Sequence, residues 1–216
     1  MDILIEGHDG RFCGLNYGNV YQLAVATILS AQATDESVNK ITPILFEKYP
    51  DAESLAAADI EDVKEIIKSI GLYNTKAKNI IAMAKRLVDE YGGRVPDTMS
   101  ELVKLPGIGR KTANIVLTAG YGKVEGIAVD THVFRISRRM GLASGNTPAK
   151  VERELLELLP ERQWPYVNHI LITHGREICT ARKPQCGECP VEELCEKNFE
   201  PEKEVRSRNT GKRRNK

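Results

Sequence analysis

Four of the five cysteines of this chain lie within one short segment near its carboxyl end. They are spaced C-x6-C-x2-C-x5-C, at Cys179, Cys186, Cys189 and Cys195. Two prolines and a glycine lie between them, so the chain can wrap around a small object. Four thiolates suit either Zn²⁺ or a [4Fe–4S] cluster, and one C-x2-C flanked by two more distant cysteines favours the cluster. The sequence therefore predicts a fold in which this segment encloses a metal centre.

Composition limits where the chain could act and how it could bind nucleic acid. Its 216 residues carry 31 basic and 30 acidic side chains, so any nucleic-acid binding must come from local basic patches. No apolar run approaches the roughly 20 residues that span a bilayer, and the first residues do not resemble a secretory signal. We therefore expect a cytosolic or nuclear protein, where clustered cysteines hold metal more often than they form disulfides. Cys13 stands apart and is expected to be a small buried hydrophobe.

Helical periodicity and capping residues recur along the chain, and the sequence predicts an all-α fold. The segment 20–31 is apolar nearly all round, which indicates a helix buried on most sides. Asp59 is expected to cap a helix that Gly71 ends in a left-handed conformation. Only GKVEGIAV, residues 122–129, resembles a strand. The helices are expected over 20–31, 60–70, 74–91, 98–105, 110–119, 131–140, 148–159 and 164–178.

The segment LPGIGRKTA, residues 105–113, joins two of these helices through a very tight turn. Pro106 ends the first helix, and Gly107 and Gly109 are expected to permit positive φ and the close approach of another backbone. The amides of the turn would then point outward beside the positive end of the second helix dipole. Such a helix-hairpin-helix signature predicts a site that binds phosphate without reading base sequence.

Lys111 and Asp130 are the candidate catalytic residues. Lys111 falls in the first turn of the second helix, where a partly desolvated cleft would disfavour its ammonium form and leave more neutral amine to act as a nucleophile. Asp130 follows an apolar stretch and precedes a helix, so its simplest role is an N-cap. It can also act on a substrate only if one carboxylate oxygen stays free of the cap.

The hairpin, the segment AVDTHVFRISRRMGL and the four-cysteine segment together resemble the endonuclease III family of DNA glycosylases. LSAQATD at 29–35 and GLYNTKA at 71–77 strengthen the resemblance, which extends over roughly residues 20–195. It implies the two-domain helix-hairpin-helix DNA glycosylase fold. A six-helix barrel domain would span 20–123, and an iron–sulfur cluster domain would combine 1–19 with 124–200. The basic stretch 201–216 is expected to be a flexible tail, or else a weak phosphate-binding arm.

The resemblance implies a bifunctional DNA repair enzyme with a [4Fe–4S] cluster held by the four cysteines. It would excise oxidised pyrimidines from duplex DNA and cut the strand 3′ to the abasic site by β-elimination. The Lys111 amine would attack C1′ and form a Schiff base, and Asp130 would stabilise positive charge and assist proton transfers. Gln32 and Leu72 match positions that fill the hole left by the flipped nucleotide and wedge the opposite strand. The DNA-binding set is completed by Gly107, Gly109, Arg110, Arg182 and Lys183.

Several alternatives stay open at this point. The chain could be a relative specialised for mismatched or deaminated bases, a non-catalytic helix-hairpin-helix DNA-binding protein, or a redox carrier. The presence of Lys111 with Asp130 favours the enzyme. Arg182 and Lys183 could equally be a solvated surface pair, whereas His132 and His174 are expected to make structural hydrogen bonds. The partner is expected to be double-stranded DNA with damaged bases or abasic sites, bound by a cytoplasmic monomer: nucleoid-associated in a prokaryote, nuclear or organellar in a eukaryote.

Overall fold

A computed structural model describes residues 1–7 and 13–199, and the predicted basic tail at 201–216 lies outside them. The regular structure of the described residues is entirely helical, which confirms the all-α prediction. None of their helices combines the length and apolar character that a membrane crossing requires. The α-helices are α1 Asp2–Glu6, α2 Val20–Leu29, α3 Asp35–Lys48, α4 Ala52–Ala56, α5 Ile60–Ile67, α6 Tyr73–Tyr91, α7 Met99–Leu102, α8 Arg110–Ile115, α9 Thr131–Met140, α10 Pro148–Leu158 and α11 Trp164–Glu177.

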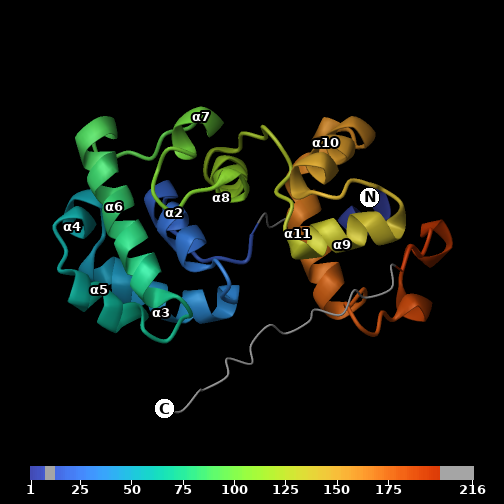
Figure 1. Ribbon diagram of the computed structural model, residues 1–216, viewed down its shortest axis with the longest axis horizontal. Coiled ribbons are helices and arrows are strands. Elements are labelled where there is room, and N and C mark those ends of the chain that lie inside the picture. Colours follow the sequence, from blue (N-terminus) through green and yellow to red (C-terminus); the bar gives the residue numbers. More distant parts are fainter. Residues whose placement is uncertain (8–12, 200–216) are drawn as a thin grey trace, which may run out of the picture.

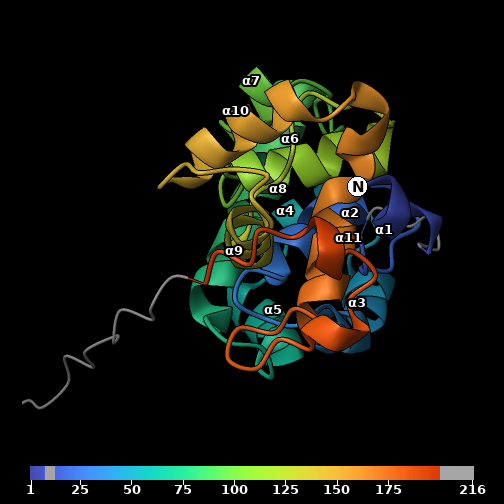
Figure 2. The same cartoon turned by 90° about the vertical axis from the view of Figure 1, so that its right-hand side faces the viewer.

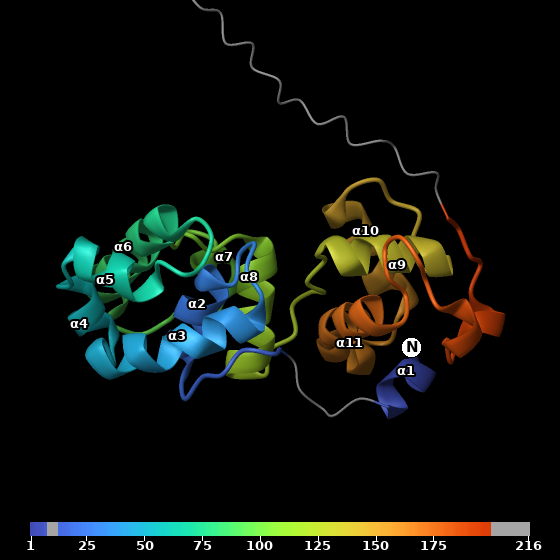
Figure 3. The ribbon, with the colours of Figure 1, turned by 90° about the horizontal axis from the view of Figure 1, so that it is seen from below.

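The helices pack around two separate hydrophobic cores, which Figure 1 shows side by side. The first core gathers α2 to α8, with the predicted buried helix α2 at its centre because nearly all of its side chains are buried. The second core gathers α9, α10 and α11. The short α1 also packs on the second core, beside α11, as the view in Figure 3 shows. Leu15, only a few residues further along the chain, is instead buried in the first core.

Most predicted helix ends are confirmed, and the exceptions have local causes. Asp59 caps α5 as predicted, and Gly92 and Gly141 end α6 and α9 with positive φ. The prediction that Gly71 is a left-handed stop is wrong, because α5 already ends at Ile67 and the positive φ, 61°, falls on Leu72. A left-handed conformation at leucine is unfavourable by itself, so the surrounding turn must impose it.

Three further segments differ from the sequence prediction. The helix predicted over 110–119 changes at Val116–Gly120 from α to π geometry. The strand-like stretch 122–129 forms no strand; it is the linker between the two cores, and its apolar character is explained by the burial of Ile127 and Ala128. Helices α3 and α4 were not predicted, although Thr34 and Asp51 cap them through side-chain hydrogen bonds.

The hairpin between α7 and α8 uses its two glycines for different reasons. Gly107 has φ +80°, and a Cβ there would lie 3.0 Å from Asn79 Cβ and 3.2 Å from Ile28 Cγ2. Gly109, the N-cap of α8, has φ −93°, so the prediction of positive φ holds for Gly107 and is wrong for Gly109. A Cβ on Gly109 would meet nothing within 4 Å. The fold therefore requires glycine at 107 but not at 109.

This difference predicts opposite outcomes for two alanine substitutions. We expect Gly107→Ala to lower the free energy of unfolding by about 1–3 kcal/mol, because it adds left-handed strain and a close contact. Gly109→Ala should change stability by less than about 0.5 kcal/mol, since a weaker N-cap and a less flexible unfolded chain offset each other. Urea unfolding measures both. Equal losses of stability in the two variants would contradict the assignment.

Candidate functional site

A cleft of about 1070 Å³, open to solvent, lies between the two cores. On the side of the first core, the cleft is lined by the turn before α3 and by the start of α8. On the side of the second core, it is lined by the start of α9 and by one face of α11. Figure 2 shows the molecule from the side of the second core, where α9 and α11 pack against each other. Lys111, Asp130 and Gln32, which the sequence singled out separately, all line this cleft.

Asp130 uses its two carboxylate oxygens for two different contacts. Oδ1 accepts hydrogen bonds from the backbone N–H groups of His132, at 2.8 Å, and Val133, at 2.9 Å, and so caps α9. Oδ2 lies 3.8 Å from Nζ of Lys111. The cap therefore leaves one carboxylate oxygen facing the cleft. This free oxygen is what Asp130 needs in order to act on a substrate as well as to cap the helix. The carboxylate is also well shielded, with only 13% of the Asp130 side chain exposed.

Lys111 is less enclosed than expected from the sequence. It lies in the first turn of α8 as predicted, but 47% of its side chain is exposed. The protein alone therefore leaves the amine in contact with water. We infer that fuller desolvation would have to come from a molecule entering the cleft.

Gln32 and Leu72 are two of the few non-glycine residues with positive φ, at 54° and 61°. Both side chains are exposed, and Leu72 is 56% exposed, so it is not the core leucine that its position after Gly71 could have suggested. The two loops are adjacent, because a Cβ on Gly71 would lie 3.9 Å from the Gln32 carbonyl oxygen. Backbone strain of this kind is concentrated at functional sites.

Arg110 has a partner within the protein that the sequence did not indicate. Its Nε and Nη2 donate to the two carboxylate oxygens of Glu152 on α10, at 2.9 and 3.1 Å. These hydrogen bonds and, to a lesser extent, the charge of Glu152 raise the pKa of the guanidinium above its ordinary value. The side chain of Arg110 is still 56% exposed, and Nη1 takes no part in this pair.

The four cysteines of the carboxyl-terminal segment line one cavity and form no disulfide. Burial, and to a lesser extent the neighbouring thiols, raise the pKa of Cys189, so thiolates in this place need a cationic centre. Among the described residues, no three His, Cys, Asp or Glu side chains form a group able to hold a single metal ion. A cavity ringed by four thiols fits a larger inorganic cluster.

Two arginines of α9 hold the backbone around these cysteines. Arg139 donates to the carbonyl oxygens of Thr180 and Ala181 at 2.7 and 2.6 Å, and Arg135 donates to that of Cys179 at 2.7 Å. The following Arg182 and Lys183 are exposed. The loop is thus anchored at its backbone while it presents two cations to solvent.

The histidines have different surroundings. Burial lowers the pKa of His132, and its buried Nδ1 has no hydrogen-bond partner, so the expected structural hydrogen bond is absent at that atom. His174 is buried, with Nε2 3.8 Å from Sγ of Cys189. The sequence analysis did not identify the residues of α11 that line the cleft, although their helical spacing was a signal. They are Asn168, His169, Ile172, Thr173, Arg176 and Glu177.

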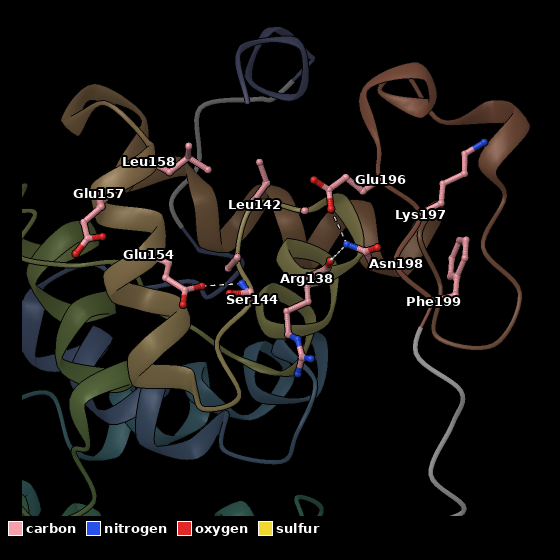
Figure 4. A pocket seen from close by; sticks show the side chains of 12 residues that line it. Arg138, Leu142, Ser144, Glu154, Glu157, Leu158, Glu196, Lys197, Asn198 and Phe199 are labelled. Carbon is pink, nitrogen blue, oxygen red and sulfur yellow. Dashed lines mark hydrogen bonds between the residues drawn. The ribbon is translucent and has the colours of Figure 1, made fainter.

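A second hollow lies apart from these residues, between the end of α9, α10 and residues 196–199 (Figure 4). Glu154 projects from α10 there and accepts hydrogen bonds from the backbone N–H groups of Ser144 and Gly145, at 2.6 and 2.9 Å. These bonds lower the pKa of Glu154. None of the predicted site residues lines this hollow.

Comparison with known proteins agrees with this geometry. The family model of the HhH-GPD superfamily base excision DNA repair proteins matches residues 25–161, and that of the iron-sulfur binding domain of endonuclease III matches 179–195. Endonuclease III of Synechocystis sp. is 49% identical over 89% of this chain and 88% of its own length. Endonuclease III of Escherichia coli is 46% identical over 84% and 86%.

Solved structures give the same result. A trapped endonuclease III–DNA covalent intermediate superimposes with a TM-score of 0.85 at 42% identity, over 91% of this chain and 92% of that one. A thermostable thymine-DNA glycosylase follows with a TM-score of 0.78 at 27% identity, over 90% and 92%. The protein thus has the two-domain helix-hairpin-helix DNA glycosylase fold, binds DNA, and is a DNA repair glycosylase and abasic-site lyase with a [4Fe–4S] cluster. The chain belongs to the endonuclease III family.

Proposed function

We propose that Lys111 is the nucleophile of this enzyme and that Asp130 is its charge partner. The observation that carries the proposal is the 3.8 Å approach of Lys111 Nζ to the uncapped Oδ2 of Asp130, between two elements that belong to different cores. The helix cap fixes the other oxygen, so the carboxylate is oriented before substrate arrives.

The proposed substrate is a nucleotide extruded from damaged duplex DNA, carrying an oxidised pyrimidine or no base at all. The Lys111 amine attacks C1′, the bond from C1′ to the base breaks, and the base leaves with the bonding electrons and takes up a proton. Loss of a proton and opening of the sugar give a Schiff base. On an abasic nucleotide the amine instead adds to the C1′ aldehyde, and water leaves. Removal of a C2′ proton then breaks the C3′–O bond and cuts the strand on that side. Asp130 Oδ2 stabilises the positive charge and exchanges protons nearby.

Replacement of Lys111 tests the nucleophile. We expect Lys111→Gln to lower borohydride trapping of an abasic duplex by at least about 10³-fold, because no amine remains to form the Schiff base. Lys123→Gln is the matched control, since Lys123 is similarly exposed, at 46%, but does not line the cleft. Trapping at the normal rate by folded Lys111→Gln would refute the proposal.

Replacement of Asp130 separates the cap from the chemistry. Asn is as good an N-cap as Asp, so Asp130→Asn should keep the stability of the protein while it lowers the single-turnover rate by about 10²-fold. Asp130→Ala should lower the rate similarly and also cost about 1 kcal/mol of unfolding free energy. If Asp130→Asn has a normal rate, the residue is a cap only.

We propose that the DNA lies across the mouth of the cleft on three contact regions. The hairpin at Gly107 and Gly109 offers backbone amides to a phosphate, and the open space at Gly109 leaves room for another backbone. Gln32 and Leu72 enter the duplex beside the extruded nucleotide. The anchored loop offers Arg182 and Lys183, and Nη1 of Arg110 is available to a phosphate.

The loop contact has a salt signature. We expect Arg182→Gln and Lys183→Gln each to reduce the slope of log Kd against log salt by about 0.9, because each removes one phosphate contact. Lys48→Gln is the control: Lys48 is 51% exposed but pairs with Asp62, away from the cleft. Fluorescence anisotropy with undamaged duplex measures the slope. Unchanged slopes for both loop variants would identify the pair as solvated surface charges.

The cysteines Cys179, Cys186, Cys189 and Cys195 are the proposed cluster ligands, and the cluster would secure a loop that has little core of its own. We propose domains over 20–123 and over 1–19 with 124–200, with the qualification that the buried Leu15 belongs to the first core. We propose that the protein acts as a monomer. Such an enzyme would act in the cytoplasm, on the nucleoid of a prokaryote.

A further inference from the structure

A buried carboxylate joins the two cores beside the catalytic lysine. Glu152 lies on α10, and only 8% of its side chain is exposed. Besides its two bonds from Arg110, its Oε1 accepts one from Asn114 Nδ2 at 3.2 Å. Arg110 and Asn114 are one turn apart on α8, so one face of this helix holds the carboxylate through three hydrogen bonds.

The linker that leads to Asp130 closes over the same carboxylate. A Cβ built on Gly126 would lie 2.4 Å from Oε1 of Glu152 and 3.0 Å from Nδ2 of Asn114. Gly126 does not have positive φ, so glycine is needed here because a side chain would not fit, and not because of the backbone conformation. Glu152 therefore meets α8, which carries Lys111, and the linker that ends at Asp130, while its own helix packs in the second core.

We propose that Glu152 is a positioning residue, which sets the separation of Lys111 and Asp130 by fixing α8 and the linker to α10. This inference rests on the roles proposed for those two residues. Apolar packing within each core does not fix one core relative to the other, because the two clusters are separate. A buried, hydrogen-bonded ion pair has a defined geometry, and its contribution lies in specifying one arrangement more than in stability.

The proposal predicts a loss of chemistry without a loss of DNA binding. A displacement of α8 by about 1 Å can lower the rate of a positioned reaction by about 10²-fold. We expect Glu152→Ala to reduce single-turnover trapping by roughly ten- to a hundredfold, and Glu152→Gln, which keeps the volume and one acceptor, by less. Affinity for a duplex containing a tetrahydrofuran abasic analogue should stay within about threefold, or increase because Arg110 is released to bind phosphate.

Val151→Ala is the control for a merely structural role. Val151 is the fully buried neighbour of Glu152 on α10, and its apolar side chain packs in the second core. Trapping is measured with enzyme in excess, at a temperature where the circular dichroism of every variant shows the folded state. Val151→Ala should lower Tm yet trap at the wild-type rate.

Two outcomes would overturn the proposal. One is wild-type trapping by folded Glu152→Ala or, if that variant does not fold, by Glu152→Gln. The other is an equal loss of rate in Val151→Ala and a Glu152 variant of the same Tm. Failure of the nucleophile assignment is distinguishable, because it would appear as normal trapping by Lys111→Gln whatever residue stands at 152.

Discussion

The shared carboxylate of Asp130 is the interaction on which the rest of this structure depends. One oxygen terminates α9 and the other faces Lys111, which is attached to a different hydrophobic core. The helix cap determines where the free oxygen points, and the packing of the two cores determines whether an amine lies opposite it. The position of this side chain thus depends both on a local sequence signal, the helix cap, and on the tertiary arrangement of the two cores, and the chemistry proposed for Lys111 and Asp130 requires both.

Helix α9 also fixes the position of the four-cysteine segment. Its cysteines are too few and too widely spaced to form a core, and the backbone between them is held by Arg135 and Arg139 from α9, the helix that Asp130 caps. The middle and end of this short helix therefore hold the four-cysteine loop, and its start carries Asp130. The exposed cations of the loop keep a fixed relation to the cleft because the same helix supports both.

The sequence predicted features that depend on neighbours within a few residues. Helix caps at Asp59 and Asp130, the glycine ends at Gly92 and Gly141, and the hairpin were readable because the chemistry is local. The pairing of Arg110 with Glu152 was not readable, because the two residues are 42 positions apart in sequence. The positive φ at Leu72 and the change to π geometry after Ile115 have no counterpart in the apolar periodicity or the capping residues. The linker was read as strand-like because burial in a core and burial in a sheet select the same apolar residues. The family motifs indicated the site more clearly than periodicity did.

The position of α1 has a consequence for how the chain is made. Met1 and Leu4 pack on the second core, and Asp2 accepts a hydrogen bond from Gln163 Nε2 at 2.6 Å, at the entrance to α11. The segment that carries α1 must therefore wait until α11 has been made before it can pack in its place. The first core lies wholly between these two helices in sequence and can be completed during synthesis, whereas the second closes only after α11 has been made.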